Sequence, residues 1–172
     1  QGIVRLNADG SFDSTFLSPN MGNSLPDVEV LSDDKLVVAG NSLFARLLPD
    51  GALDPAFTTS VTPYWKLGMQ PDGKILTATA DGTLTRRNAD GSVDTTFTSS
   101  VFNSTIWDIR VQTDGKILVG GQFTTLNSFS RPKIARLNAD GTGDLTFSSP
   151  FGTAGTSFKV IPLADGRILI GG

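Results

Sequence analysis

The sequence predicts an all-β protein built from four copies of one structural unit. The motif "NADGSFDSTF" at 7–16 returns in related form at 48–57, 88–97 and 138–147. Between these copies, Asp-Gly pairs alternate with short apolar runs, which is typical of β-hairpins. Turn residues interrupt each stretch before a helical period could extend over three turns. A repeat of about 40 residues indicates a fold made by stacking small β units.

Each unit contains two hairpin turns with an aspartate at the centre. Gly usually follows this Asp and supplies the positive φ that tight hairpins need. The first turns are centred on Asp9, Asp50, Asp90 and Asp140. The second turns are centred on Asp33, Asp72, Asp114 and Asp165, with Asp34 in place of Gly in the first of them. We expect the basic residues after the second turns to lie in solvent at the hairpin tips; they are Lys35, Lys74, Lys116 and Arg167.

The apolar runs predict four short strands in each unit. In the first complete unit these strands are expected at 28–31, 36–40, 43–48 and 52–57. Repeated four-stranded units of this size are the signature of β-propeller blades, which bury both faces by stacking around an axis. We therefore predict one β-propeller domain over 1–172, with repeats at approximately 28–57, 67–97, 109–147, and 160–172 joined to 1–16.

The two ends of the sequence complement each other. Joining "ILIGG" at 168–172 to the N-terminal "QGIVRLNADG" completes one repeat. We therefore expect strand 168–172 to pair antiparallel with strand 2–7 and to close a ring of four blades, which would remove exposed sheet edges. The alternative is that the four repeats belong to a larger propeller or to a ring shared by several chains.

The third repeat resembles a known bacterial repeat. The stretch "QTDGKILVGGQFTTLNSFSRPKIARLNADGTGDLTF" at 112–147 is similar to the delta-60 repeat, and the other three repeats are shorter versions of it. The resemblance implies a β-propeller within a large secreted, cell-surface or phage-associated protein. It implies no settled activity.

Composition argues against several classes of function. The chain has no His for acid–base chemistry near neutral pH and no Cys nucleophile or thiolate ligand. Its net charge of −3 lacks the basic footprint of a nucleic-acid-binding protein. No apolar run approaches the ~20 residues of a membrane-spanning helix. We therefore expect a protein that is not an enzyme, does not bind nucleic acid and does not insert into a membrane.

An arginine and an aspartate flank the first turn of every repeat. Across a hairpin such residues become near-opposed neighbours. We expect four Arg–Asp pairs that hold adjacent strands together, and a ring of anion sites is the alternative. The predicted pairs are Arg5 with Asp13, Arg46 with Asp54, Arg86 with Asp94, and Arg136 with Asp144.

Charges also alternate at the entrance to the first strand of each repeat. The residues are Asp27, Lys66, Asp108 and Lys159. Around an axis each charge would face neighbours of opposite sign. We predict that these four residues line one mouth of a central channel.

Oxygen-bearing side chains in "NADGSFD" raise the question of calcium. Asn7, Asp9 and Asp13 have suitable ligand atoms, but the full EF-hand pattern is missing. Tight turns select the same residue types without any metal. We expect no metal and no cofactor, with calcium as the one candidate.

Variable segments on a rigid scaffold are where binding residues are expected. The candidates are Tyr64, Trp65, Trp107, Phe123, Phe129 and Arg131. We expect a non-enzymatic structural or protein-binding module of a bacterial surface protein, secreted protein or phage virion, with a glycan-binding, lectin-like propeller as the alternative. The expected partners are proteins of such an assembly or a glycan, and a homo-oligomer is compatible with the repeats. The expected location is extracellular, on the cell surface or in a virion.

Overall fold

The computed structural model describes residues 2–17, 19–20, 27–153 and 159–172. Within these ranges the regular structure consists of short antiparallel strands and turns. The described residues form no helix long and apolar enough to cross a membrane. The chain is therefore all-β over its described length.

The first two sheets are consecutive meanders. One has the order β1-β2-β3, and the next has the order β4-β5-β6-β7. The strands of the first sheet are β1 (Asp27–Val30), β2 (Leu36–Ala39) and β3 (Phe44–Leu47). The strands of the second are β4 (Tyr64–Met69), β5 (Ile75–Thr79), β6 (Thr83–Arg87) and β7 (Ser100–Val101).

The remaining strands form a third sheet, an inserted hairpin and a terminal pair. The third sheet contains β8 (Ile106–Val111), β9 (Ile117–Gly121) and β12 (Ile134–Leu137). The inserted hairpin consists of β10 (Thr125–Leu126) and β11 (Phe129–Ser130). The terminal pair consists of β13 (Lys159–Pro162) and β14 (Ile168–Gly171).

The aspartate turns lie where the sequence predicts them. In the turn between β1 and β2, Asp34 occupies the position of Gly and has a φ of 63°. Asp tolerates this left-handed conformation better than most residues do. The backbone N–H of Asp34 donates to the carbonyl of Leu31, which closes the turn.

The predicted fourth strand at 52–57 does not form. Leu53 makes one isolated bridge to Leu47, and the chain then turns away from the sheet. The turn arises because Asp54 Oδ1 accepts the N–H of Ala56 at 2.9 Å, and the N–H of Phe57 donates to the carbonyl of Asp54. An Asx turn of this kind competes with strand pairing. Only the second sheet has four strands within the described residues.

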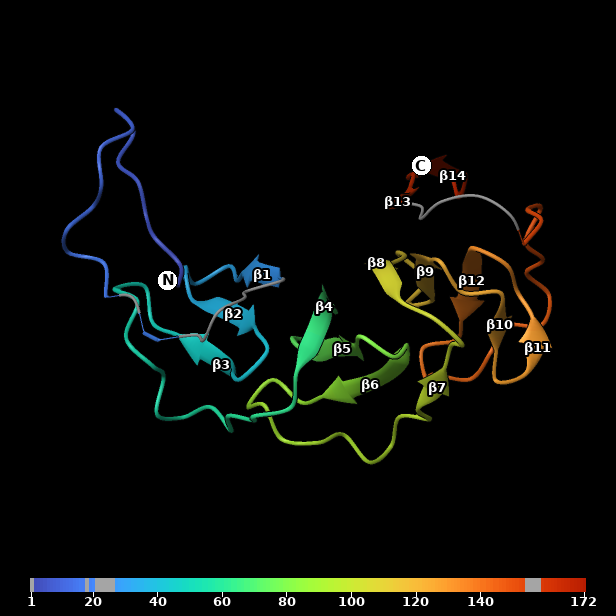
Figure 1. Ribbon diagram of the computed structural model, residues 1–172, viewed down its shortest axis with the longest axis horizontal. Coiled ribbons are helices and arrows are strands. Elements are labelled where there is room, and N and C mark those ends of the chain that lie inside the picture. The colour runs from blue at the N-terminus through green and yellow to red at the C-terminus, as the bar shows by residue number, and fades with distance from the viewer. Residues whose placement is uncertain (1, 18, 21–26, 154–158) are drawn as a thin grey trace.

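The sheets follow one another along an arc, with the first strand of each on the concave side (Figure 1). The order of these inner strands is β1, β4, β8 and β13, and consecutive members lie against each other. The core lies between the sheets. Three fully buried residues of middle strands, Val37, Leu76 and Leu118, share clusters with the next sheet's inner-strand residues Leu67, Ile109 and Val160, respectively.

The predicted pairing of 168–172 with 2–7 is absent. Within the described chain β14 pairs only with β13, and residues 2–7 lie on the opposite arm of the arc (Figure 1). Four quarter-turns would bring the two ends together, so the rotation per repeat is smaller than a quarter-turn. The expectation of a four-blade ring closed within one chain is therefore not confirmed, because stacking these sheets gives an open arc.

Candidate functional site

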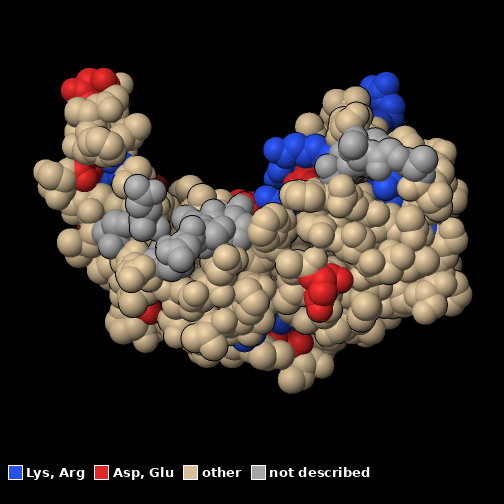
Figure 2. All heavy atoms as spheres, in the orientation of Figure 1, with Lys and Arg blue, Asp and Glu red and all other residues tan. Residues whose placement is uncertain are grey.

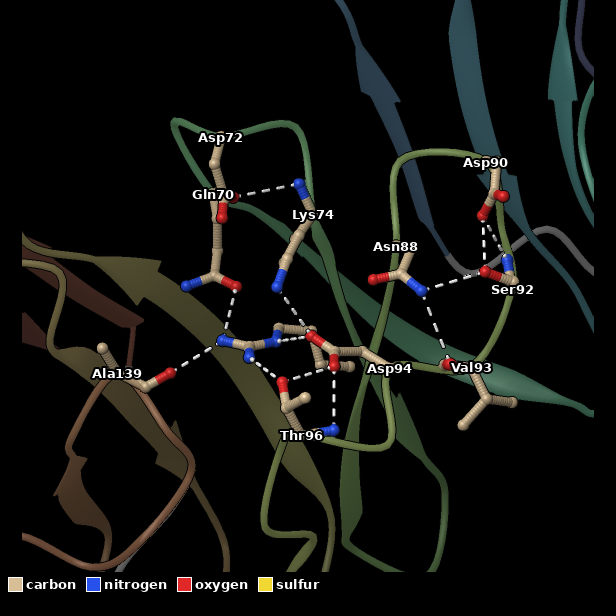
Figure 3. Close-up of polar contacts among 11 residues, drawn as sticks. Gln70, Asp72, Lys74, Asn88, Asp90, Ser92, Val93, Asp94, Thr96 and Ala139 are labelled. Atoms are coloured by element: carbon tan, nitrogen blue, oxygen red, sulfur yellow. Dashed lines mark hydrogen bonds and ion pairs between the residues drawn. The ribbon is translucent and has the colours of Figure 1, made fainter.

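A buried polar cluster lies at the end of the second sheet where its two Asp turns emerge (Figure 3). Arg86 Nε donates to Asp94 Oδ2 at 2.7 Å, and Lys74 Nζ donates to the same oxygen at 2.9 Å. Asp94 Oδ1 accepts the N–H and the hydroxyl of Thr96 at 2.9 and 2.6 Å. One carboxylate therefore joins both hairpins of the repeat.

The same pair recurs in every repeat. The Nε–Oδ2 distances are 2.8 Å for Arg5–Asp13, Arg46–Asp54 and Arg136–Asp144. Each arginine also lies over the ring of an aromatic residue of its own motif, at 4.7–5.0 Å from the centroid; these residues are Phe16, Phe57, Phe97 and Phe147. Arg86 is the most buried of the four, with 9% of its side chain exposed, and Arg5 is the least, with 43%.

The lysines after the second turns are not free at hairpin tips. Lys74 and Lys116 bind Asp94 and Asp144 at 2.9 and 2.8 Å, and Lys35 lies 3.6 Å from the carboxylate of Asp54. The expectation of solvated tips is wrong for these three residues. The two Asp turns follow the first and third strands of a repeat and therefore emerge at the same end of the blade, so the lysine after one turn reaches the aspartate after the other.

Hydrogen bonding keeps these carboxylates ionised. The hydroxyl of Thr96 and the ammonium of Lys74 hold the pKa of Asp94 well below its usual range. Lys116 and Thr146 do the same for the pKa of Asp144. Hydrogen bonds from Thr15 and Arg5 lower the pKa of Asp13 to about 2. No proton is available from these groups near neutral pH.

Three of the four arginines also reach the following repeat. Nη1 of Arg46 and of Arg86 donates to the carbonyls of Ala89 and Ala139, both at 2.7 Å, and Arg5 donates to the carbonyl of Pro49. Beside these bonds, the N–H groups of Leu17, Thr58 and Thr98 donate to the carbonyls of Asp50, Asp90 and Asp140. We call this set of contacts the inter-repeat clamp. Its donors are used within the protein, which favours a structural role over an anion site.

The predicted channel-mouth residues lie on the inner strands. Basic and acidic atoms meet at the concave edge of the arc (Figure 2). Asp27 Oδ2 accepts from Lys66 Nζ at 2.9 Å and from the N–H of Leu67 at 2.7 Å. Asp108, which is fully buried, accepts the N–H of Val160 at 3.0 Å. Lys159 begins β13 and is exposed.

One inner-strand residue was missed by the sequence reasoning. Arg110 Nε lies 3.3 Å from Asp108 Oδ1, so the partner of Asp108 comes from its own strand. Among the described residues no ion pair joins Asp108 to Lys66 or Lys159. Asp108 and Arg110 are separated by one residue on β8. This spacing places both side chains on one face of a strand and could have indicated the pair.

Two tryptophans project from equivalent irregularities at the start of β4 and β8. The strand register shifts between Tyr64 and Lys66 and again between Ile106 and Asp108, which leaves Trp65 and Trp107 outside the ladder. Bulges of this kind re-aim side chains. The two indole rings lie 6.0 Å apart at 77°, an edge-to-face pair, and Trp107 is 39% exposed. We call these two residues the tryptophan pair.

Two other binding candidates are core residues, which contradicts their assignment. Tyr64 is 4% exposed and packs edge-on against Phe44, and its hydroxyl accepts from Arg87. Phe123 is fully buried against Phe102 at 4.5 Å. Both aromatic rings fill space between blades, so neither is available to a ligand.

The inserted hairpin holds the last two candidates. Phe129 is 58% exposed, and together with Arg131 and Leu145 it lines a hollow of about 170 Å³ on the outer side of the third sheet. Gly143 occupies the place where other repeats carry Phe12, Leu53 or Val93, all exposed, and Leu126 packs beside it. Neither Trp65 nor Trp107 lines this hollow, so the tryptophan pair and the hollow are separate surfaces.

The calcium candidates are engaged in turn contacts. Asp9 Oδ1 accepts the N–H and the hydroxyl of Ser11, and the amide of Asn7 donates to the same hydroxyl. Asp13 is bound by Arg5 and Thr15. Within the described ranges no group of three or more His, Cys, Asp or Glu could hold a metal ion.

The repeats match a known sequence family. The profile of the family "domain of unknown function (DUF5122) beta-propeller" matches residues 1–16, 31–57, 70–97 and 112–147, which is more than half of the chain. The chain belongs to the DUF5122 β-propeller family. The matched segments contain the arginine and the aspartate of all four Arg–Asp pairs. A search of curated proteins found no match.

A solved β-propeller structure shares the fold of this DUF5122 chain. It is similar to the WD40 β-propeller domain of Doa1, with a TM-score of 0.66 and 16% identity, over 94% of this chain and 51% of that one. A protein of unknown function from Bacteroides caccae matches at 11% identity over 81% of this chain and 56% of that one, with a TM-score of 0.49. The chain thus spans about half the length of these structures.

Proposed function

We propose that the chain is a non-enzymatic β-propeller module that binds a protein partner through the tryptophan pair. The supporting observation is the pair itself. Two equivalent bulges bring two large aromatic side chains to one place, next to the Lys66–Asp27 ion pair. Tryptophan is among the residue types enriched at the energetic centres of protein interfaces.

The partner chemistry follows from what surrounds the pair. Lys66 and Arg110 are partly exposed, and the carboxylate of Glu29 on β1 interacts electrostatically with both of them. Burial raises the pKa of Glu29 above its usual value. A peptide segment that carries an apolar side chain and charges of both signs would match this surface.

A glycan is the second candidate, favoured by the exposed ring of Trp107. Indole faces stack on apolar faces of ligands, and the edge-to-face packing leaves one Trp107 face without a partner ring among the described residues. A sugar would need only this face and the nearby charged groups.

The test compares two ligand libraries with two variants. The protein is screened against random peptides displayed on phage and against a glycan array, and hits are repeated with Trp107→Ala and Phe129→Ala. We expect peptide ligands that bind at least 10-fold more weakly to Trp107→Ala and equally well to Phe129→Ala, the matched exposed aromatic of the other surface. Peptide ligands that Trp107→Ala still binds fully would contradict the proposal. Glycan ligands lost in Trp107→Ala would replace it by the second candidate.

The repeat type and location belong to the same proposal. We infer that the repeats are of the delta-60 type, since "QTDGKILVGG" at 112–121 and "IARLNADG" at 134–141 carry the resemblance and also form β9, β12 and their turns. The location that this type implies is a bacterial surface, a secreted protein or a phage virion. The proposed partners are proteins of that assembly, and no nucleic acid is expected.

A further inference from the structure

The interface between consecutive repeats has two parts, each of which occurs three times within the described residues, and the two parts occur together at two of the junctions. It consists of the inter-repeat clamp and of a buried contact from a middle strand to the next inner strand, as with Val37 and Leu67. A first-turn glycine completes it: a Cβ on Gly141 would lie 2.2 Å from the carbonyl oxygen of Thr98 in the preceding repeat. The equivalent distances at Gly51 and Gly91 are 1.9 and 2.5 Å.

The C-terminal arm presents one side of this interface without its other side. Leu169 of β14 is 55% exposed, whereas the equivalent Val37, Leu76 and Leu118 are fully buried. Arg136 binds Asp144, but within the described chain it has no carbonyl partner in a following repeat, unlike Arg46 and Arg86.

The N-terminal arm presents the other side. Val28 of β1 is 40% exposed, whereas the equivalent Leu67 and Val160 are fully buried. Gly10 has a φ of 86° like the other first-turn glycines, but a Cβ there would meet nothing within 4 Å. Beside these residues lies a hollow of about 450 Å³ lined by Val4, Val28, Val30 and Leu36, among others.

We propose that the N-terminal arm of the chain binds the C-terminal arm of a second copy, so that the copies associate head to tail. The β13–β14 pair of one copy enters the hollow of the next, and the two form one composite blade. Leu169 then packs on Val28 of the other copy, and Arg136 donates to the carbonyl of Ala8 there, as Arg86 does to Ala139. The contact continues an interface that the chain already contains.

The internal registers fix the strand pairing of the composite blade. Between β2 and β3, Ala39 pairs with Phe44 and Val37 with Arg46. By repeat equivalence, Gly171 pairs with Ile3 of the other copy, and Leu169 pairs with Arg5. This pairing covers the free edge of β14.

Charge and length favour two copies. The inner strands run Asp27, Lys66, Asp108, Lys159, so Lys159 would meet Asp27 of the next copy and the alternation would continue. The chain matches 51% of a solved WD40 β-propeller domain, so two copies account for its full length. When a heterologous contact closes after two copies, the two chains form a ring without open sheet edges.

The first test is a disulfide, for which the chain is suited because it has no cysteine. The variant Ile3→Cys/Gly171→Cys is oxidised and examined on a non-reducing gel. Gly171 has open space for a side chain. The proposed Gly171–Ile3 pair is a non-hydrogen-bonded pair, the type of antiparallel pair in which opposed side chains lie closest. We expect a covalent dimer as the main product. A monomer with an internal disulfide, a ladder of higher multimers, or no disulfide at all would overturn the proposal.

The second test uses two glycines of matched conformation. Gly10 and Gly166 have φ of 86° and 85°, and neither has a neighbour within 4 Å of a Cβ. In the dimer, the Cβ of Gly10→Ala would meet a backbone carbonyl of the other copy, just as a Cβ added to Gly141 would meet the carbonyl of Thr98. The Cβ of Gly166→Ala would meet no such carbonyl. We expect Gly10→Ala to weaken dimerisation at least 10-fold and Gly166→Ala to leave it unchanged. Equal dimerisation of the two variants would overturn the proposal. The tryptophan pair takes no part, so this result is independent of peptide binding.

Discussion

At the scale of single residues, the aspartate after the first turn is the centre of each repeat. Asp94 accepts from Arg86, Lys74 and Thr96, and 6% of the residue is exposed. A buried carboxylate that has lost a partner retains the full cost of its desolvation. The arginines therefore contribute to stability according to how deeply their pair is buried.

The arginine pairs provide a graded test. Because Arg86 has 9% of its side chain exposed, Arg86→Met should lower the free energy of unfolding by about 3 kcal/mol, as for a broken buried pair. Arg5→Met is the matched control: its side chain is 43% exposed, and the change should cost less than about 1 kcal/mol, as for a surface pair. Urea denaturation of the two variants measures the difference. Equal losses would contradict the structural role of burial.

Spacing in the sequence was enough to predict the Arg–Asp pairs as neighbours, because residues four positions either side of a hairpin turn come to face each other. It was not enough to place Tyr64 or Lys74. The burial of Tyr64 depends on Phe44 of the preceding repeat, and the position of Lys74 depends on how two turns of one blade converge. Such contacts join segments that are far apart in the sequence, and local sequence patterns do not predict them.

At the scale of elements, turns and the first three strands of a repeat follow local rules. The predicted 28–31, 36–40 and 43–48 correspond to β1, β2 and β3 within one or two residues. The fourth strand fails because Asp54 satisfies the backbone of Ala56 with its own side chain. Apolar residues at 52–57 indicated a strand, and the turn-forming capacity of this aspartate outweighed them.

At the first turns, glycine is needed both for a positive φ and for the close approach of the preceding repeat. A pair of variants separates these two requirements. Gly141→Ala and Gly115→Ala share the cost of a positive φ, about 1–2 kcal/mol. Only at Gly141 would the new Cβ also enter the preceding repeat, 2.2 Å from the carbonyl oxygen of Thr98, whereas at Gly115 the nearest atom is 3.7 Å away. We expect Gly141→Ala to lose about 1–3 kcal/mol more than Gly115→Ala, as overpacked sites do. Thermal unfolding of both variants would reveal it, and indistinguishable midpoints would argue against close contact between repeats.

At the scale of the whole molecule, the number of repeats did not determine the closure. The sequence shows four repeats and complementary ends, which fits both a small ring and half of a larger one. The angle between repeats decides, and it arises from the packing of whole sheets, such as Leu118 against Val160. In the structure this angle leaves an open arc whose two arms carry matching halves of one interface.

The most direct test of this account is the mass and shape of the protein in solution. Light scattering coupled to size exclusion, followed by small-angle X-ray scattering on the same peak, gives both. We expect twice the chain mass of 18.1 kDa and the scattering of a closed, compact ring. A particle of 18.1 kDa at all concentrations, whether an open arc or a compact ring, would contradict the continuation of the inter-repeat interface into a second copy.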